Sequence, residues 1–258
     1  MLENDFQLLA KSLPYSNANG SSHWETTRLK ILNQLQMEGP ANFLTWPDIL
    51  YTMVIDSEEV AQKEYNALSH SPNYLDYNGI GNGKYSKTYP HTMNNTIHQA
   101  YHIDAFFQLT GKHLEDYDNI IEFGGGYGCM CDLIHRQGFK GNYYIFDFPE
   151  FHILQDYYLK NNNVNNFHKI NNLNIIVKGT TAFVGMWSFS ESPIAFRDNL
   201  KPHIKNFNAD VFFALQSSYE GYDNISYFRE LRDYLGKRQN QLEEIPWLGN
   251  NYYMTGVN

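Results

Sequence analysis

The stretch that decides the fold is Ile120-Ile121-Glu122-Phe123-Gly124-Gly125-Gly126-Tyr127-Gly128. Two β-branched residues lie in a buried strand, an acid follows, and glycine then recurs at every second position. Glycine allows the backbone to turn with φ > 0 and to bring its N–H groups against a ligand, because it has no Cβ. Asp147 ends the next apolar run, 19 residues after Gly128, where nucleotide-binding α/β units place the acceptor for ribose hydroxyls. The stretch therefore predicts a cofactor that contains adenosine.

The spacing of the glycines argues against a dinucleotide. A dinucleotide fingerprint is G-x-G-x-x-G/A, and both registers of this run end on a cysteine, Cys129 or Cys131. The third glycine is therefore absent, and Glu122 would repel a pyrophosphate. A glycine-rich turn that binds no ligand is the alternative.

An acid two residues before G-x-G-x-G resembles the first motif of class I S-adenosylmethionine-dependent methyltransferases. This resemblance implies that Glu122 faces the ammonium of the cofactor's methionine and that the glycines pass beneath its methionine and ribose. Asp147 is expected to accept both ribose hydroxyls and Phe148 to pack on the adenine, although Asp147 could instead cap the next helix. The expected cofactor-binding residues are Glu122, Gly124, Gly126, Gly128, Asp147, Phe148, Asn172 and Trp187.

Composition limits the function classes. The chain has 258 residues, 42% of them hydrophobic, which suffices for one α/β domain and an appended segment. Its formal net charge of −9 argues against nucleic-acid partners, which need a basic surface. The acidic start lacks a signal-peptide pattern, and no apolar run approaches a membrane span. Cys129 and Cys131 are the only cysteines and cannot bridge comfortably. We expect a reduced, cytoplasmic enzyme, and a homodimer is left open.

The first part of the chain predicts helices and one long loop. Helices are expected over about residues 24–37, after Trp46-Pro47, over 58–68 and from 94–95 to about 109. The loop 78–91 is rich in Gly, Asn and Tyr, and such long loops are usually functional or disordered. We therefore predict an N-terminal helical segment at 1–112 that forms a lid and binds the acceptor, followed by a catalytic domain at 113–258.

From residue 117 strands and helices alternate, which predicts an α/β sheet. Strands are expected near 119–123, 143–147, 167–170, 182–187, 210–216, 241–245 and 251–255, with 174–177 competing for the third strand. Helices are expected near 127–137, 149–160, 194–204 and 226–236, and the last two strands should form a hairpin. The layout, over about residues 95–258, is similar to the Rossmann-like, seven-stranded methyltransferase fold, whose last strand inserts antiparallel.

Local signatures narrow the resemblance. The glycine run with Asp147-Phe148-Pro149 resembles the G-G-G-x-G and D-L-P pair of small-molecule O-methyltransferases. Residues 187–191, Trp-Ser-Phe-Ser-Glu, and Gln216 with Asp223-Asn224 and Tyr227-Phe228 resemble the bacterial sugar O-methyltransferases. In the D-L-P enzymes a histidine follows the fourth strand as general base, whereas Trp187-Ser188 stands here.

The base must therefore be sought elsewhere. Glu191 follows the fourth strand, and its alternative role is in the N-terminal cap region of the next helix. His91 lies in the long loop, where closure over an apolar site could tune its pKa. His98, His102 and Tyr219 come next. The two histidines have metal-ligand spacing, but a zinc protease needs Glu at Gln99, so we expect a packed or hydrogen-bonded pair and no metal.

The acceptor is expected to be a sugar, with a nucleoside diphosphate attached. Lys84 and Lys87 are the basic pair in the loop, and Tyr85 and Tyr89 offer flat faces to a ring; two solvated lysines on a disordered loop are the alternative. Further substrate-binding candidates are Arg197, Gln216, Tyr219 and Asn224.

The sequence thus predicts an S-adenosylmethionine-dependent O-methyltransferase that acts on a sugar, in surface polysaccharide biosynthesis. A methyltransferase acting on a phosphorus-containing or aromatic small molecule is one alternative. A non-catalytic protein that binds an adenosyl ligand is another. The sequence leaves open the acceptor hydroxyl, the general base and the oligomeric state.

Overall fold

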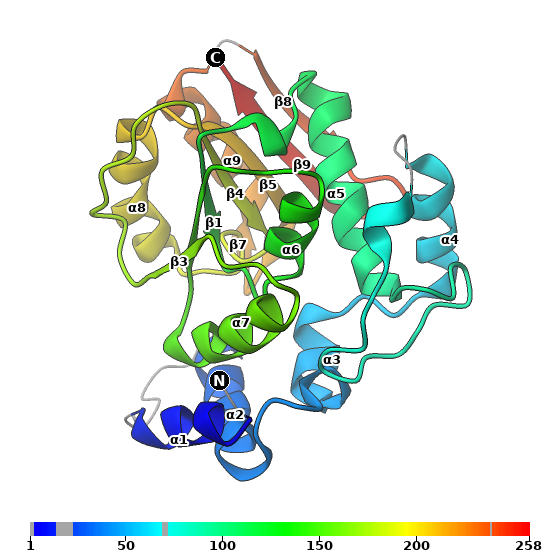
Figure 1. The fold of residues 1–258 in the computed structure, drawn as a ribbon. Helices are drawn as coiled ribbons and strands as arrows, with labels where there is room; N and C mark the ends of the chain where they lie inside the picture. Colours follow the sequence, from blue (N-terminus) through cyan, green and yellow to red (C-terminus); the bar gives the residue numbers. More distant parts are fainter. Residues whose placement is uncertain (1–2, 14–22, 69–71, 238) are drawn as a thin grey trace. The chain divides into compact units, whose positions relative to one another are not determined.

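The structure is a computed structural model that describes residues 3–13, 23–68, 72–237 and 239–258 (Figure 1). Their contacts divide the chain into two compact units, and the chain enters each more than once. The helical unit holds the described residues within 1–101, 126–133 and 147–165, and the sheet unit holds those within 102–125, 134–146 and 166–258. The domain boundary predicted between residues 112 and 113 stays a prediction.

Local sequence signals set the helix ends in the helical unit. Proline begins both α3 and α7, where the missing N–H is tolerated, and the Ser57 side chain caps α4 by accepting from the Val60 N–H at 3.3 Å. The helices of this unit are α1 (Glu3–Ser12), α2 (His23–Glu38), α3 (Pro47–Met53), α4 (Glu58–Ala67) and α7 (Pro149–Asn161), with the 3₁₀ turns η1 (Phe43–Thr45) and η2 (Pro72–Leu75). Two further helices, α5 (Asn94–Thr110) and α6 (Cys129–Arg136), contribute residues to both units.

Apolar runs form the main sheet of the sheet unit. The described residues give a seven-stranded sheet of order β3-β2-β1-β4-β5-β9-β8, in which β9 is antiparallel to both its neighbours and the other pairs are parallel. The strands are β1 (Asn119–Phe123), β2 (Asn142–Phe146), β3 (Phe167–Ile170), β4 (Thr181–Met186), β5 (Asp210–Gln216), β8 (Gln239–Glu244) and β9 (Asn251–Val257). The strand order reverses between β1 and β4, and open α/β sheets bind ligands at the carboxyl ends of such a switch point.

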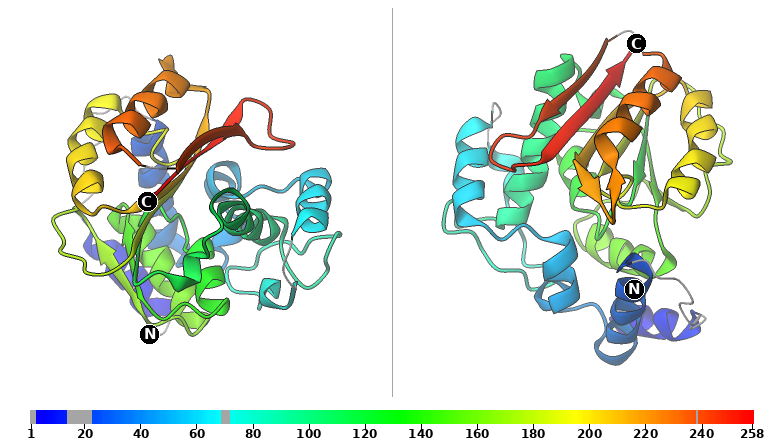
Figure 2. Two further views of the ribbon diagram at one scale, coloured as in Figure 1. Left: turned by 90° about the horizontal axis from the view of Figure 1, so that it is seen from above. Right: turned by 180° about the vertical axis from the view of Figure 1, so that it is seen from behind.

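Both faces of the sheet are covered within this unit. Phe213 of β5 belongs to the apolar cluster that includes Leu200 of α8 (Ile194–Asn206) and Leu231 of α9 (Asn224–Leu235). Its neighbour Phe212 points to the opposite face and packs on Phe106 of α5, with ring centroids 5.4 Å apart. Helices α8 and α9 therefore lie on one face and residues 102–110 of α5 on the other (Figure 2).

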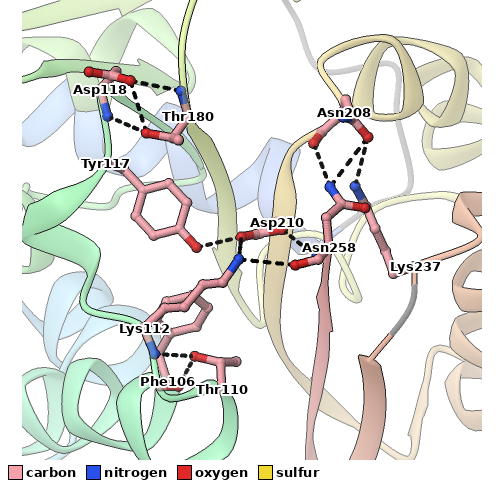
Figure 3. A network of polar contacts seen from close by, with 10 residues as sticks. All are labelled: Phe106, Thr110, Lys112, Tyr117, Asp118, Thr180, Asn208, Asp210, Lys237 and Asn258. Carbon is pink, nitrogen blue, oxygen red and sulfur yellow. Dashed lines mark hydrogen bonds and ion pairs between the residues drawn. The ribbon is translucent and has the colours of Figure 1, made fainter.

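A polar network connects the start of β5 to the end of β9, at the amino ends of the parallel strands (Figure 3). One Asp210 carboxylate oxygen accepts from Lys112 Nζ at 2.7 Å and from the Tyr117 hydroxyl at 2.6 Å, and the other accepts from the Asn258 N–H at 2.9 Å. Burial and the hydrogen bond to Asp210 raise the pKa of the Tyr117 hydroxyl, so it stays protonated as a donor. We assign this network a structural role, because it lies at the end of the sheet opposite the carboxyl ends of the parallel strands.

The predicted α/β, Rossmann-like sheet with its antiparallel last strand is confirmed. The predicted strands and helices form within a few residues of their expected bounds, and residues 174–177 are not a strand. Two elements have no counterpart among the predicted ones: helix α1, and a short hairpin formed by β6 (Ser218–Tyr219) and β7 (Tyr222–Asp223). The hairpin turn needs φ > 0 at both central residues, and Glu220 adopts φ 46° beside Gly221, which a glutamate does not signal.

The N-terminal helices are confirmed, whereas the lid function assigned to them stays a prediction. None of the helices in the described residues is long and apolar enough to cross a membrane.

Candidate active site

The glycine turn begins at the end of β1 in the sheet unit. Gly124 has φ 72°, which favours glycine, and its N–H donates to the Phe146 carbonyl at 2.8 Å. A Cβ on Gly124 would lie 2.3 Å from Ser188 Cβ, and one on Gly125 would lie 2.8 Å from a Glu122 carboxylate oxygen. The chain's own packing therefore requires glycine at these two positions.

Glu122 is a buried carboxyl beneath this turn. Its side chain alternates with Ile121 and Phe123, which face the α8–α9 cluster, so Glu122 faces the other side of the sheet. It is 4% exposed and accepts a hydrogen bond from the Tyr143 hydroxyl at 3.0 Å. Burial raises the pKa of Glu122 to about 7, and the Tyr143 hydrogen bond opposes the rise only in part. Near neutral pH this carboxyl is therefore poised to ionise when a cationic group binds beside it, because a neighbouring positive charge stabilises the carboxylate.

The second half of the glycine run belongs to the helical unit. Gly126 has φ 56°, and its N–H donates to Asp147 Oδ2 at 3.1 Å. A Cβ on Gly128 would touch Leu159 at 3.0 Å, so Gly128 too is limited by packing. The structure thus brings Gly126 and Asp147, both predicted cofactor-binding residues, into direct contact.

Asp147 and Phe148 lie at the start of α7. Asp147 Oδ1 accepts from the Phe148 N–H at 2.8 Å, and the cap position of α7 is Phe148, which makes no side-chain cap bond. The alternative of Asp147 as the helix cap is therefore not realised. Phe148 is 38% exposed, and the guanidinium of Arg28 lies 5.3 Å from the centre of its ring while pairing with Glu150 at 2.9 Å. No local pattern in the sequence predicts this contact between α2 and the Phe148 ring.

Trp187 and Ser188 follow β4 in the sheet unit. Trp187 adopts φ 61°, which is rare for a bulky residue and typical of functional sites. Its indole Nε1 donates to Asn251 Oδ1 at 2.8 Å, and its ring lies 5.1 Å from the ring of His102. The Ser188 hydroxyl donates to the Phe123 carbonyl, which ties the end of β4 to the end of β1.

A buried arginine organises the loops that follow β4 and β5. The Arg197 guanidinium donates to the carbonyls of Ser190 and Ser192, which flank Glu191, and to Asn224 Oδ1. Asn224 Nδ2 in turn donates to the Gln216 carbonyl at 3.0 Å. Arg197 is fully buried, so the structure uses its donors within the protein. The role of Arg197 in binding the acceptor stays a prediction.

Glu191 is held by this arrangement. Its carboxylate accepts from Gln216 Nε2 at 3.3 Å, it is half-buried, and the cap position of α8 is Pro193. The sheet unit thus brings Glu122, Gly124 and Trp187 to the carboxyl ends of β1 and β4. It gathers Glu191, Gln216 and Asn224 in the neighbouring loops.

Two predicted residues lie farther along the sheet unit. Asn172 follows β3, is exposed, and donates to Asn171 Oδ1 at 2.8 Å. Tyr219 is half-buried in the β6–β7 hairpin, where it pairs with Tyr222. The roles of Asn172 and Tyr219 in binding stay predictions.

The loop 78–91 of the helical unit is anchored to acidic residues. Lys84 Nζ pairs with Asp56 at 2.8 Å, the Lys87 backbone N–H donates to Glu58 at 3.0 Å, and the Tyr89 hydroxyl donates to Asp76 at 3.3 Å. Desolvation acts to raise the pKa of Glu58, but the hydrogen bonds that its carboxylate accepts from Lys87, Asn94 and Thr88 outweigh it and lower the pKa.

The rings of the loop contact the residue before it, helix α4 and one another. Tyr85 packs on Tyr77 with centroids 5.3 Å apart, Tyr89 stacks on Tyr65 at 5.4 Å, and His91 is exposed beside Tyr89. The loop therefore has defined contacts of its own.

Each of the paired histidines is buried and hydrogen-bonded, as expected. His98 Nδ1 lies 2.7 Å from Glu64 Oε1 in the helical unit, and His102 contacts the Tyr253 hydroxyl in the sheet unit. Among the described residues, no group of three or more His, Cys, Asp or Glu side chains is placed to hold a metal. The absence of a metal stays a prediction.

Sequence reasoning missed Gln155, which donates through Nε2 to the Gly126 carbonyl at 2.9 Å and to Asp147 Oδ2 at 3.0 Å. The only available signal was a polar residue on the apolar face of the helix predicted at 149–160, where Phe151 and Leu159 share its i±4 stripe.

No protein-family model and no curated protein matches this sequence. Solved structures do match. A protein from Nostoc punctiforme PCC 73102 that carries the name O-methyltransferase is 10% identical over 60% of this chain and 55% of its own, with a TM-score of 0.47. An O-methyltransferase family protein from Burkholderia thailandensis is 7% identical over 64% and 60%, with a TM-score of 0.46. PigF, solved with SAH, is 11% identical over 87% and 76%, with a TM-score of 0.48.

This chain thus spans 55% and 60% of the length of the first two structures. At these identities and TM-scores the likeness does not assign a function to this chain.

The buried carboxyl gives a test by pH. Because the pKa of Glu122 is about 7 in the folded protein against an ordinary 4.5, the unfolded chain ionises first as the pH rises. Wild-type stability should therefore fall between pH 4.5 and 7 relative to Glu122→Gln, by ~3 kcal/mol at 1.36 kcal/mol per pKa unit, and then level off. Urea unfolding at several pH values measures this difference.

The exposed Glu230 of α9 serves as the matched control. The stability of Glu230→Gln relative to wild type should not change with pH in this way, because the Glu230 side chain is not buried. A stability difference between wild type and Glu122→Gln that stays constant from pH 4.5 to 8 would contradict the buried, raised-pKa carboxyl.

Proposed function

We propose that this chain is an S-adenosylmethionine-dependent O-methyltransferase that methylates a hydroxyl of a sugar. The observation that carries the proposal is the buried Glu122 carboxyl, with its pKa raised to about 7, under a glycine turn at the switch point of the sheet. An ammonium beside Glu122 gains electrostatic stabilisation, whereas a pyrophosphate would meet a like charge. S-adenosylmethionine carries such an ammonium and supplies a methyl group activated by its sulfonium.

The contacts of Asp147 support the adenosine part of the proposal. Its carboxylate is fixed by the N–H groups of Gly126 and Phe148, and the Phe148 side chain is exposed enough for its ring to pack on an adenine. These are the residues expected to bind ribose and adenine. An NAD-type ligand would also use a ribose acceptor, so Glu122 rather than Asp147 discriminates between the two cofactors.

Glu191 is our candidate for the general base. Methyl transfer to a hydroxyl needs alignment of the acceptor and a group that takes its proton. Arg197 holds the carbonyls on both sides of Glu191, and Gln216 donates to its carboxylate, so Glu191 has the defined position that a base requires. His91 is exposed in the loop of the helical unit and is the second candidate.

For the acceptor we propose a nucleotide-linked sugar, used in surface polysaccharide biosynthesis, with Lys87 as the main diphosphate contact. The Lys84 ammonium is engaged by Asp56, whereas no ion pair of the Lys87 ammonium occurs among the described residues. Asp56, Glu58 and Asp76 all bond to this loop, and their negative charge favours a second candidate, an uncharged sugar.

Other readings of the same fold remain distinct hypotheses. A methyltransferase acting on an aromatic or phosphorus-containing molecule would release S-adenosylhomocysteine with those acceptors. A non-catalytic binder of an adenosyl ligand would release none with any acceptor. The cytoplasmic location, the homodimer and the lid role of the N-terminal helices belong to the proposal as well.

The cofactor assignment predicts that S-adenosylhomocysteine binds and that NAD does not. Binding of its ammonium should lower the pKa of Glu122 and so release up to one proton near pH 7. Calorimetry in buffers of different ionisation enthalpy measures this release. Glu122→Gln should bind S-adenosylhomocysteine at least ~10-fold more weakly, because it loses one charge-assisted hydrogen bond. Binding to this variant should release no proton from this site. NAD binding, or equal proton release by the variant, would contradict the assignment.

The base assignment predicts a catalytic defect without a binding defect. A screen of nucleotide sugars and free sugars for S-adenosylhomocysteine release first identifies an acceptor. With it, Glu191→Gln should lower kcat by ~10²–10⁴-fold while leaving S-adenosylhomocysteine affinity unchanged, and His91→Asn should retain near-normal turnover. If His91→Asn shows the loss and Glu191→Gln does not, the base is in the loop.

The acceptor assignment predicts a selective loss. Lys87→Ala should lower kcat/KM for a nucleotide sugar by ~10-fold, the value of one charge-assisted contact, and leave the matching free sugar unaffected. Lys84→Ala should do less, because Asp56 already pairs with it. Lys63→Ala, which breaks an exposed pair with Glu59, is the control. Equal losses on both sugars would rule out a diphosphate contact at Lys87.

A further inference from the structure

A closed ring of hydrogen bonds links the glycine turn to α7 inside the helical unit. Gly126 N–H donates to Asp147 Oδ2 at 3.1 Å. Gln155 Nε2 donates both to that same oxygen at 3.0 Å and to the Gly126 carbonyl at 2.9 Å. Three segments that are separate in sequence, the turn, the end of β2 and the second turn of α7, thus meet at one carboxylate oxygen.

The orientation of the Gln155 amide follows from its neighbours. Both atoms within reach of its nitrogen are acceptors, so the opposite assignment would set its carbonyl oxygen against two acceptors. The oxygen Oε1 therefore points elsewhere, and within the described part of the chain it is buried with no hydrogen-bond partner. Gln155 itself is fully buried.

This burial is unfavourable for a residue that only fills space. A buried acceptor without a partner destabilises the fold, and an apolar side chain of the same length would avoid that cost. The α7 face around it already buries Ile153, Leu154 and Tyr158, so the helix is anchored without Gln155. What the amide adds is the position of Asp147 relative to Gly126.

We propose that Gln155 is a positioning residue that holds the Asp147 carboxylate in the orientation needed to accept ribose hydroxyls, an inference that rests on the proposed adenosyl cofactor. The Phe148 N–H fixes Oδ1 at 2.8 Å and Gln155 with Gly126 fixes Oδ2. The carboxylate therefore cannot rotate about its side-chain bonds without breaking hydrogen bonds. A rigid acceptor loses less entropy when a diol binds. Gln155 thus contributes to selectivity for ribose over deoxyribose without touching the ligand.

The test compares two ligands on matched variants. Calorimetry gives the affinity of S-adenosylhomocysteine and of its 2′-deoxy analogue for wild type and Gln155→Met, which keeps side-chain length and removes both donors. The wild type should prefer the ribose ligand by at least ~10-fold, as expected for a hydrogen bond to a charged group. Gln155→Met should lose most of that preference, with the affinity of the deoxy ligand changed less than ~3-fold. A purely structural role would weaken both ligands equally.

Two further variants secure the interpretation. Asp156→Asn alters the neighbouring buried polar residue of α7, which pairs with Lys160, and should leave the ribose preference intact. Gln155→Asn retracts the amide by one methylene and should lose the preference too, so it decides the question if Gln155→Met does not fold, as judged by circular dichroism and Tm.

Each remaining outcome has a defined meaning. An unchanged ribose preference in Gln155→Met, or equal weakening of both ligands, overturns the positioning role and leaves the cofactor assignment standing. A wild type that binds S-adenosylhomocysteine without preferring ribose also overturns it. A wild type that binds neither ligand overturns the proposed function and this inference together.

Discussion

The sheet unit is built around one unfavourable burial, that of the Glu122 carboxyl. Glu122 lies on β1, which is an inner strand paired with β2 and β4. Its side chain is therefore far from the outer strands of the sheet and stays buried. Gly125 must lack a Cβ because that atom would strike the carboxylate, and Tyr143 must carry its hydroxyl because it is the donor. Natural proteins retain such costs mainly at functional sites, which is why the chemistry is sought here.

Much of the fold could be predicted because its signals are local. Short apolar runs identify the strands, and the prolines at α3 and α7 mark helix starts. The long-range contacts had no such signal. Nothing in the sequence shows that Gln155 reaches Gly126, that Arg28 lies over Phe148, or that Glu220 adopts φ > 0. Each of these depends on segments far apart in the chain or on a backbone state that its residue type seldom adopts.

Arg197 illustrates how a residue that stands out in the sequence can have a structural role in the fold. The sequence predicted that this guanidinium contacts the substrate, and the folded chain buries it against the Tyr227 ring and three backbone or amide oxygens. The signature residues after β4 and β5 then acquire a common explanation. Ser190, Asn224 and Tyr227 all contact one guanidinium, so the two loops are joined by a single side chain. Planar, multidentate donation of this kind suits arginine and not lysine.

The place of β9 bears on how this protein is made. Strand β5 is buried along nearly its whole length, yet its partner on one side is β9, residues 251–257, which also separates it from β8. During synthesis the ribosome releases β5 some 35 residues before that partner. Until then an apolar strand presents an open edge, the surface from which chains aggregate. Because β9 is synthesised last, the inner strand β5, rather than an outer strand of the sheet, is the segment most exposed to aggregation while the chain is growing.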